Sequence, residues 1–508
     1  MNTVADAPLR GLITVSIMLA TVMQVLDMTI ANVALPHMQG NLSATQEQIA
    51  WVLTSYIVAA AIMTPPTGYL AARFGRKRLF AWTVGGFIVA SMLCGASTTL
   101  PELVGFRILQ GMCGAGLVPL SQAVLLDTYP REKHGSAMAM WGIGVMVGPI
   151  LGPTLGGYLT EYYNWRWIFY INVPFGLLAL AGILAFVPET QRDSKRPFDL
   201  FGFALLSISI GALQLMLDRG SSKDWFDSTE IVIEATLAGL FLYLFLVQMF
   251  TARRPFLEPG LFRDRNFAIG LFIMFIISII LLSTVTLLPP FLQNLKGYPV
   301  ITTGFVLAPR GMGTMAAMIM VGILANRVDA RLMILTGLIL TVISLWEMAG
   351  FDLNVSMWTL VHTGIVQGLG LGLIFVPLTT MTFITLAPHF RNEGTAMFSL
   401  MRNMGSSIGV SVMITLLGQQ TQTNHAILTE QITPFNGALN GTWDTGTASG
   451  LVALNAEVTR QAAAIAYLDD FRLMIVIVLL AVPLVALLRG ARYADAERAR
   501  QEAYAAAE

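Results

Sequence analysis

The chain has 508 residues, of which 55% are hydrophobic and only 12% are charged, and its mean hydropathy is +0.68. Average proteins carry about 25% charged residues, so this composition excludes a soluble globular protein and indicates a polytopic membrane protein. The formal net charge is +0, which gives no electrostatic basis for binding nucleic acid. The two cysteines, Cys94 and Cys113, lie in apolar runs and predict no disulfide framework.

Fourteen apolar segments are long enough, at about 20 residues or more each, to cross about 30 Å of hydrocarbon. The first begins soon after the N-terminus and is too long for a signal peptide, so we interpret it as a retained first helix. The predicted membrane-spanning segments are residues 12–35, 50–71, 79–98, 102–126, 136–159, 167–187, 200–218, 230–250, 267–291, 302–324, 331–350, 356–386, 395–417 and 471–488.

The distribution of Lys and Arg among the loops predicts that both termini are cytoplasmic. In this orientation, 21 of the 30 Lys and Arg residues lie on the inner side and six on the outer side. The other three, Arg107, Arg310 and Arg402, lie within apolar segments. Residues 419–470 are polar and are expected to form a long outer loop, in which residues 453–467 are a candidate short helix.

The first apolar segment ends in LDMTIANVALP and places one carboxylate, Asp27, at bilayer depth. An ionisable residue there is costly, so Asp27 is a candidate functional residue, and we predict that it carries a proton. The alternatives are that Asp27 is a structural hydrogen-bonding group, or that the helix ends early and leaves it in water. Asn32, in the same stretch, is a candidate for lining a substrate cavity.

The fourth segment contains RILQGMCGAG, in which Arg107, Gln110, Gly111 and Gly114 share one helix face. At 1.5 Å per residue, Asp27 lies roughly 22 Å from the inner start of the first helix, and Arg107 roughly 8 Å from the outer start of the fourth. The two charges are therefore predicted at similar depth, where they are candidates for sharing one polar cavity. A static structural pair, or placement on separate faces, is the alternative.

The loop between the second and third segments reads GYLAARFGRKR. Gly68 and Gly75 permit close backbone approach and a tight turn, while Arg73, Arg76 and their basic neighbours hold the loop on the cytoplasmic side. A weaker version, GILANRVDAR, follows the tenth segment. A motif repeated in both halves of the chain is typical of a transporter built from internal repeats.

The fifth segment contains a glycine every fourth residue, a spacing that lets two membrane helices pack backbone to backbone. Two prolines beside the stripe are expected to bend the helix. The residues are Gly144, Gly148, Gly152 and Gly156, with Pro149 and Pro153. The twelfth segment has a similar stripe at Gly364, Gly368 and Gly372. Such a seam is a packing surface that we expect to flex or slide.

Several further polar residues lie within apolar segments and are candidates for lining a substrate cavity. They are Gln110, Arg310, Glu347, His362, Gln367 and Arg402. Each of them alone is also compatible with an interfacial side chain, and Glu347 most of all because it lies near the outer end of its helix. The abundant methionine and aromatic residues suit a cavity for varied apolar ligands, although lipid-facing positions explain most of them individually.

These motifs together resemble the major facilitator superfamily, and in particular the EmrB-like branch of the fourteen-helix drug:proton antiporters. LDMTIANVALP resembles the first-helix motif of that family, GYLAARFGRKR the superfamily loop motif, RILQGMCGAG the helix 4 motif and GVMVGPILGPTLGG the antiporter motif of helix 5. WRWIFYINVPFG is similarly typical of the branch. The resemblance covers essentially the whole chain.

The resemblance implies an all-α fold with two six-helix bundles and an inserted helix pair. The expected domains are an N-terminal bundle at residues 1–190, the inserted pair at 191–266, a C-terminal bundle with the outer loop at 267–490, and a cytoplasmic tail at 491–508. It also implies alternating access, proton-driven efflux and location in the bacterial inner membrane. EmrB-like members work with a periplasmic membrane-fusion protein and an outer-membrane channel, and the long outer loop is consistent with such partners.

The chain departs from the superfamily loop motif at one position. That motif usually has an acidic residue just before its first arginine, where this chain has Ala72. A conformational latch that uses this carboxylate therefore does not carry over. Asp127, at the inner end of the fourth segment, is a candidate partner for Arg73 or Arg76 instead.

The leading hypothesis from the sequence is a secondary active exporter of hydrophobic or amphipathic compounds in the lipid bilayer, driven by the proton gradient, with Asp27 and Arg107 in the coupling site. An alternative is a dedicated exporter of one native metabolite, such as a fatty acid or a siderophore. A membrane enzyme or receptor is a third possibility, but no nucleophile motif or metal-binding cluster of His and Asp is visible. The sequence also lacks GxxxxGK[ST], so neither ATP nor any other cofactor is expected.

Overall fold

The structure is a computed structural model that describes residues 7–130, 133–190, 198–253, 255–325, 327–387, 390–430, 432 and 447–489. Helices make up nearly all of these residues, and no β-strand occurs among them. The expectation of an all-α protein is therefore confirmed. The side chains of Pro149 and Pro153 lie outside the described part of the chain, as does the tail from residue 490 onward.

The helices fall into three groups along the chain. The N-half consists of α1 (Ala7–Asn41), α2 (Gln46–Met63), α3 (Pro66–Phe74), α4 (Arg76–Ala96), α5 (Leu100–Gly114), α6 (Leu117–Thr128), α7 (His134–Tyr162), α8 (Trp167–Tyr170) and α9 (Asn172–Phe186). The inserted pair is α10 (Leu200–Arg219) and α11 (Thr229–Thr251), with 3₁₀ turns at Gly220–Ser222, Trp225–Asp227 and Pro259–Arg263. The C-half consists of α12 (Arg265–Pro290), the π-helical η5 (Phe291–Leu295), α13 (Val300–Leu324), α14 (Ala330–Met348), α15 (Met357–Ile384), α16 (Arg391–Glu430) and α17 (Ala448–Leu487).

Local sequence signals explain several helix boundaries. Thr45 and Thr99 begin α2 and α5 with capping boxes, in which the threonine and the third residue of the helix exchange hydrogen bonds. Pro65 lies between α2 and α3, Pro66 is the first residue of α3, and the two helices meet at 57°. A proline has no amide hydrogen to continue the helical ladder, so it is the physical cause of this bend.

All fourteen predicted segments coincide with helices. Twelve helices among the described residues are long and apolar enough to span a membrane, and the bent pair α2 and α3 makes a thirteenth. The 29-residue helix α7 covers the remaining predicted segment, 136–159. The number of helices that cross the membrane, and the cytoplasmic location of both termini, stay predictions.

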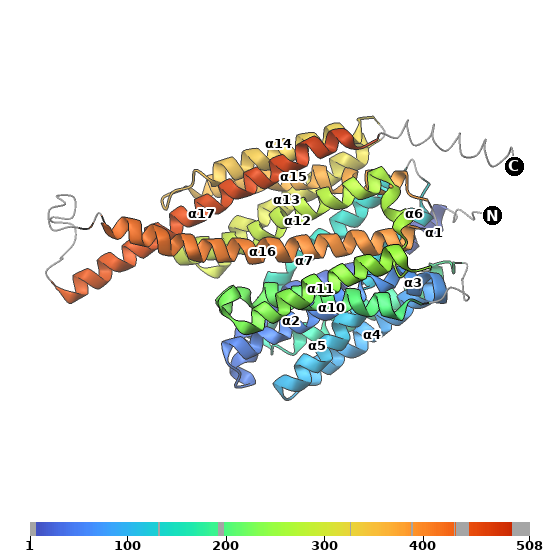
Figure 1. The fold of residues 1–508 in the computed structure, drawn as a ribbon, viewed down its shortest axis with the longest axis horizontal. Coiled ribbons are helices and arrows are strands. Elements are labelled where there is room, and N and C mark those ends of the chain that lie inside the picture. Colours follow the sequence, from blue (N-terminus) through green and yellow to red (C-terminus); the bar gives the residue numbers. More distant parts are fainter. Residues whose placement is uncertain are drawn as a thin grey trace.

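The candidate short helix at residues 453–467 of the predicted outer loop is confirmed, since it lies within α17, whereas the expectation of a loop over the rest of residues 419–470 is largely wrong. α16 continues to Glu430 and α17 begins at Ala448, so much of the segment forms two helical extensions that project beyond the other helices in Figure 1. Residues 431 and 433–446 lie outside the described residues. Polar composition suggested a loop, but an exposed helix in water is also polar. The candidate helix carries an apolar residue at every fourth position, and these residues form the buried face of this part of α17: Leu454, Val458, Ala462 and Ala466.

The inserted pair lies between the two halves on one side of the molecule (Figure 1). Asp218 of α10 accepts a hydrogen bond from Thr54 of α2 in the N-half. On its other side, Gln214 Nε2 donates to Ser407 Oγ of α16 at 2.6 Å, and Ser411 Oγ of α16 donates to the carbonyl oxygen of Leu217 at 2.6 Å. α10 thus connects α2 with α16 through polar contacts.

The topology can be tested by cysteine labelling in intact cells. A cysteine replacing Ser449, near the start of α17, should react from the outer side, because the Lys and Arg distribution places this region outside. A cysteine replacing Ser194, which lies outside the described residues, should react only from the inner side. Labelling of both positions from one side would contradict the fourteen-helix topology.

Candidate functional site

Asp27 is the centre of a buried polar network formed by three helices of the N-half. Its Oδ2 lies 2.7 Å from Arg107 Nη1 of α5, and its Oδ1 accepts hydrogen bonds from Gln110 Nε2 at 2.9 Å and from Asn172 Nδ2 of α9 at 2.7 Å. Asp27 is only 2% exposed and Arg107 only 1%. The structure therefore brings Asp27 and Arg107 together in one buried polar site, as the sequence predicted, while their role in proton coupling stays a prediction.

Arg107 has further partners that fix its guanidinium group. Its Nε donates to the carbonyl oxygen of Val52 in α2 at 3.0 Å, and its Nη1 also donates to Gln110 Oε1 at 2.8 Å. The Tyr56 ring lies 4.3 Å below the guanidinium carbon, a cation–π contact. Breaking a buried ion pair by removing one partner typically costs about 3–5 kcal/mol. The network therefore joins α1, α2, α5 and α9 and is sensitive to the charge of Asp27.

Asn172 was missed from the sequence. It follows the predicted helix start in WRWIFYINVPFG, is 1% exposed and also donates to Ser91 Oγ of α4 at 3.0 Å. The available signal was an amide within an apolar segment, which in a membrane must find a polar partner. Asn32, by contrast, is exposed on α1 and makes none of the contacts to Asp27 described above.

The glycine stripe of α7 packs against α1, the helix that carries Asp27. A Cβ added at Gly148 would lie 2.9 Å from Val25 Cβ, and one added at Gly152 would lie 2.7 Å from Thr29 Cβ. Thr29 Oγ1 also donates to the carbonyl oxygen of Gly148 at 3.2 Å. Gly144 and Gly156 continue the same contact toward the two ends. The predicted backbone-close seam is therefore present, and it positions the proton-carrier candidate.

The second glycine stripe forms the equivalent seam in the C-half. A Cβ at Gly368 of α15 would lie 2.9 Å from the Thr314 amide nitrogen of α13, and one at Gly372 would lie 2.6 Å from Ala317 Cβ. Gly364 is less crowded, since its Cβ would lie 3.7 Å from Arg310 Cβ. Each half therefore contains a glycine stripe that permits close contact between two of its helices.

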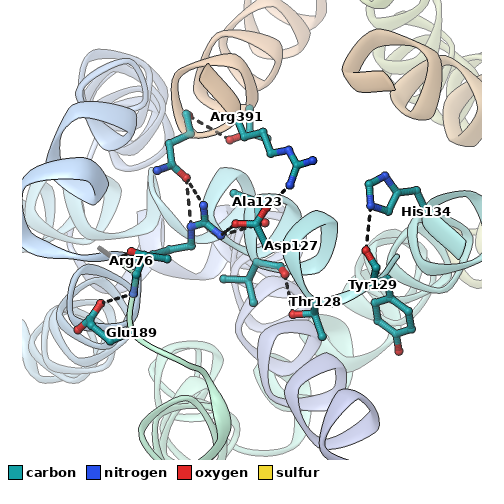
Figure 2. Close-up of polar contacts among 12 residues, drawn as sticks. Arg76, Ala123, Asp127, Thr128, Tyr129, His134, Glu189 and Arg391 are labelled. Atoms are coloured by element: carbon teal, nitrogen blue, oxygen red, sulfur yellow. Dashed lines mark hydrogen bonds and ion pairs between the residues drawn. The ribbon is translucent and has the colours of Figure 1, made fainter. Parts of the chain in front are cut away.

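Asp127 connects the two halves at the inner ends of the helices (Figure 2). Its Oδ2 pairs with Arg76 Nη1 at 2.6 Å, and its Oδ1 pairs with Arg391 at the start of α16. Arg76 also donates through Nε and Nη2 to Asn392 Oδ1 at 3.1 and 2.8 Å. Of the two predicted partners of Asp127, Arg76 is confirmed, whereas Arg73 donates to the Tyr69 hydroxyl instead.

Gly68 and Gly75 allow the backbone geometry that brings the ion-pair cluster around Asp127 together. A Cβ at Gly68 would lie 2.8 Å from the Glu393 backbone, so only glycine lets α3 approach the start of α16 so closely. Gly75 has a φ of 90°, a conformation that favours glycine, and it turns the chain from α3 into α4. Arg391 and Asn392 were missed from the sequence, because a short polar run at a helix start looks like an ordinary solvated helix end.

A second contact closes the inner side between α7 and α13. Ser136 Oγ donates to the carbonyl oxygen of Gly322 at 2.9 Å, and a Cβ at Gly135 would lie 2.7 Å from Ala325 Cβ. Gly322 and Ala325 belong to the weaker loop motif GILANRVDAR. The loop motif and its weaker repeat thus each contact the opposite half.

The remaining cavity candidates of the C-half do not form one hydrogen-bonded group. Glu347 Oε2 accepts from Thr363 Oγ1 at 2.8 Å and lies 3.4 Å from His362 Nδ1, so these three residues make a separate cluster. Arg310 is 9% exposed, and its single hydrogen bond among the described residues is donated to the carbonyl oxygen of Leu281 in α12, at 3.2 Å. Gln367 is 0% exposed, and Arg402 is half-buried.

Comparison with known proteins defines the family. The Major Facilitator Superfamily model matches residues 17–410. The chain belongs to the major facilitator superfamily. It is 38% identical over 439 residues to the multidrug export protein EmrB of Escherichia coli (strain K12), covering 84% of this chain and 85% of the relative. The corresponding identity to the probable multidrug resistance protein EmrY of the same strain is 35% over 479 residues, covering 92% and 94%.

Two further comparisons are informative. The fatty acid resistance protein FarB of Neisseria gonorrhoeae is 36% identical over 440 residues, covering 86% of this chain and 87% of the relative. The solved structure of the proton:xylose symporter XylE has a TM-score of 0.60 and 12% identity, covering 92% and 97%, which is a likeness of fold alone. This chain is therefore an EmrB-like, multi-pass transporter of the bacterial inner membrane rather than an enzyme.

The Asp127 cluster gives a testable prediction about the inner closure. Asp127→Asn removes both inter-helix ion pairs, each partly exposed and worth about 1 kcal/mol or less. A cysteine replacing Ser136, in a background without Cys94 and Cys113, should then react about fivefold faster with an inner-side reagent. Arg73→Gln is the matched control, because Arg73 bonds to Tyr69 and not to Asp127. Equal labelling rates in Asp127→Asn and the parent would show that the cluster does not hold this end closed.

Proposed function

We propose that this transporter is a proton-coupled antiporter that exports hydrophobic and amphipathic compounds, including drugs, by alternating access. The observation that carries the proposal is the buried Asp27 network. Asp27 is the only acidic residue in α1, and it lies within an apolar helix beside an arginine that has no other carboxylate partner among the described residues. The relatives EmrB and EmrY, named for multidrug export and probable multidrug resistance, support the export of drugs.

A proton on Asp27 would change the contacts that connect four helices. The neutral carboxyl loses its charge-assisted bond to Arg107, while the amides of Gln110 and Asn172 can still donate to its carbonyl oxygen. Arg107 keeps the Val52 carbonyl and the Tyr56 ring. Protonation therefore loosens α1 from α5 without removing every contact. Because protonation weakens some helix contacts and keeps others, it would shift the equilibrium between conformations, and this shift couples proton binding to conformational change.

The energy of the proton gradient is sufficient for export. A membrane potential of 100 mV and a gradient of one pH unit supply about 2.3 and 1.4 kcal/mol for each proton that enters. Together they support several-hundred-fold accumulation of a neutral compound on the outer side. Neither nucleotide hydrolysis nor a cofactor is required in this scheme.

The proposal is tested with purified protein in liposomes. An imposed pH gradient should drive uptake or release of an amphipathic dye, and addition of the dye to detergent-solubilised protein should change the bound protons in a pH-dependent way. Transport that is unaffected by collapsing the gradient with an ionophore would contradict proton coupling.

A dedicated exporter of one native metabolite, such as a fatty acid, is the second candidate. The relative FarB is named for fatty acid resistance and is about as similar to this chain as EmrY is. The two candidates differ in ligand range. Transport of structurally unrelated dyes and drugs would favour multidrug export, whereas saturable transport of fatty acids alone would favour the dedicated exporter.

We further propose that the extensions of α16 and α17 engage a periplasmic membrane-fusion protein, which would link the transporter to an outer-membrane channel. His425 Nε2 of α16 and Asn455 Oδ1 of α17 lie 3.0 Å apart, so a polar contact joins the two extensions. Three apolar side chains on them are more than half exposed: Ile427, Leu451 and Val452. Exposed apolar residues on a projecting surface suit a protein partner.

Removing these extensions should reduce export by whole cells without impairing transport by the purified protein. Replacing residues 425–455 with a short Gly/Ser linker keeps Arg460, which bonds to the Leu295 carbonyl oxygen of η5 at 3.1 Å. Whole-cell efflux should fall severalfold, while transport in liposomes should stay within about twofold of the parent. His425→Ala, which removes only the contact with Asn455, is the control. Loss of transport in liposomes as well would place the extensions in the transport core.

A further inference from the structure

The buried side chains of α1 differ on the two sides of Asp27. On the predicted outer side, every buried residue in the described part of this helix is apolar: Ile30, Ala31, Ala34 and Met38. On the predicted inner side, the buried residues include four polar ones: Thr14, Ser16, Thr21 and Gln24. Hydroxyl and amide groups can exchange hydrogen bonds with a proton carrier, whereas apolar groups cannot. Along α1, polar groups therefore continue from Asp27 toward the inner end and not toward the outer end.

An apolar cluster covers the outer side of the Asp27 network. It joins the outer part of α1 with α2, α5 and α8. Members from these four helices are all fully buried or nearly so: Ile30, Val52, Leu103, Ile168 and Phe169. These side chains carry no hydrogen-bonding group, so they offer a proton on Asp27 no path to the outer side in this arrangement of the helices.

Tyr56 of α2 lies on the inner side of the pair formed by Asp27 and Arg107. Its ring centre is 4.3 Å from the guanidinium carbon, and its hydroxyl oxygen would lie 2.8 Å from a Cβ added at Gly114, two turns of α5 inward of Arg107. The side chain of Gln24 lies close to this hydroxyl. Neither the hydroxyl nor Gln24 Oε1 has a hydrogen-bond partner among the described residues. Two buried polar groups with unused hydrogen-bonding capacity therefore adjoin the Asp27 network on its inner side.

Buried polar groups continue from this point to the inner ends of α1 and α6, which pack against each other. Thr14 Oγ1 of α1 lies 3.0 Å from the hydroxyl oxygen of Tyr129, which follows α6. Two turns closer to the membrane centre, Thr21 of α1 and Gln122 of α6 lie at the same level, because the two helices run in opposite directions. Gln122 is 0% exposed, and neither its Oε1 nor its Nε2 has a partner within the described part of the chain. The buried polar groups thus extend from Asp27 to the inner end of the N-half.

The chemistry of these groups suits the transfer of a proton. Buried amides and hydroxyls without a protein partner are costly, and proteins commonly satisfy such groups with bound water. A tyrosine hydroxyl donates and accepts, so it can take a proton from one neighbour while it gives its own to the next. The charged or titratable groups around the Tyr56 hydroxyl are Asp27, Arg107 and the thiol of Cys113. Of these, Asp27 is the proposed proton carrier, so Tyr56 lies next to the group whose proton must leave.

We propose that the Tyr56 hydroxyl, positioned by Gln24, relays the proton of Asp27 to the inner side along the polar groups between α1 and α6. The O–H bond of Asp27 breaks as its proton passes, directly or through one bound water, to the Tyr56 oxygen, and the original Tyr56 proton leaves on the inner side. The products are an intact tyrosine and an ionised Asp27 that pairs with Arg107. This inference rests on the proposed proton-coupled export and specifies how the proton leaves. The route lies within the N-half, so the proton and the exported compound use different passages.

The test follows proton release by stopped flow, with a pH indicator in solution, after purified full-length protein is mixed with an amphipathic dye. Tyr56→Phe keeps the ring over Arg107 and removes only the hydroxyl. Release should slow by about 100-fold in this variant and by about tenfold in Gln24→Met, since a positioned proton-transfer group typically contributes about 10²- to 10⁴-fold. The number of protons released and the dye affinity should not change, because Asp27 still titrates. Tyr158→Phe, which removes the hydroxyl of an exposed tyrosine on α7, is the matched control and should behave like the parent.

Equilibrium measurements separate a relay from a structural role. Loss of a relay slows release but leaves the Tm, the dye affinity and the number of released protons as in the parent, whereas loss of a structural hydrogen bond lowers the Tm. Release at the parent rate in Tyr56→Phe would overturn the proposal, as would a lower Tm or fewer released protons in that variant. In liposomes with the protein in one orientation, release of the proton on the outer side would overturn the route. A parent that releases no proton on binding dye would instead overturn the proton-coupled function, and the relay with it.

Discussion

Asp27→Asn should abolish transport driven by a pH gradient while the protein still folds and binds ligand. Asparagine has nearly the same shape as the protonated aspartic acid, so α1 can keep its packing against α7 and α9. Its carbonyl oxygen can still accept from Asn172 or Gln110, which lie 2.7 and 2.9 Å from the aspartate oxygens in the parent. An amide cannot release a proton at any physiological pH. The variant is therefore expected to resemble a permanently protonated transporter.

The decisive measurement is proton release on ligand binding, followed across pH with purified protein. In the parent, ligand affinity should depend on pH, because binding and protonation act on the same equilibrium. In Asp27→Asn this dependence should vanish, together with pH-driven transport in liposomes, whereas equilibrium exchange of ligand should persist. Glu161→Gln, which changes an exposed carboxylate at the end of α7, is the control and should behave like the parent.

An unchanged proton signal in Asp27→Asn would contradict the proposed coupling site. Glu347 would then be the next residue to test, since it is the carboxylate that the sequence places within an apolar segment of the C-half, as Asp27 is in the N-half. Its contacts with Thr363 and His362 differ from those of Asp27, because no arginine pairs with it among the described residues. The structure favours Asp27 over Glu347 as the proton-coupling residue, since Asp27 is buried and its carboxylate binds groups on two other helices.

The helices and the centre of the site could be predicted because strong local signals mark them. Each span is a long apolar run, and Asp27 and Arg107 are conspicuous as charges in such runs. Their depth followed from the helical rise alone, which is why the pair was found without a structure. The glycine stripes were equally visible, since a four-residue period places all the glycines on one face.

What the sequence did not reveal depends on contacts between distant segments. Nothing local indicates that Arg391 reaches Asp127, which is 264 positions away in the chain. Asn172 has a neutral side chain and lies within the predicted apolar segment 167–187, where no charge marks it. Residues 453–467 were expected to be a short helix, but the extension of α16 to Glu430 and the start of α17 at Ala448 were mistaken for a loop because their composition is polar.

The seam between α7 and α1 leads to the second large expected effect. Gly148→Leu should abolish transport, because even the Cβ would lie 2.9 Å from Val25 Cβ and 3.0 Å from the Val25 carbonyl carbon. Backbone atoms cannot move aside as a flexible side chain can, so α1 and α7 would have to separate. Overpacking of this kind typically costs about 1–3 kcal/mol. Displacement of α1 would also shift Asp27, two residues beyond Val25, relative to Arg107.

The loss of transport should depend on where in α7 the leucine is placed, and not simply on the volume that the leucine adds. Gly157→Leu, nine residues further along α7, is the matched control, because nothing lies within 4 Å of a Cβ at that position. It should transport normally in liposomes at the same expression level. Gly148→Ala should be intermediate, since it introduces the Cβ without the rest of the leucine side chain. Normal transport by Gly148→Leu would show that α1 and α7 need not stay in close contact during the cycle. If Gly148→Leu instead folds and keeps its ligand affinity but loses transport, the seam acts on the movement of α1 and the Asp27 network rather than on assembly of the binding cavity.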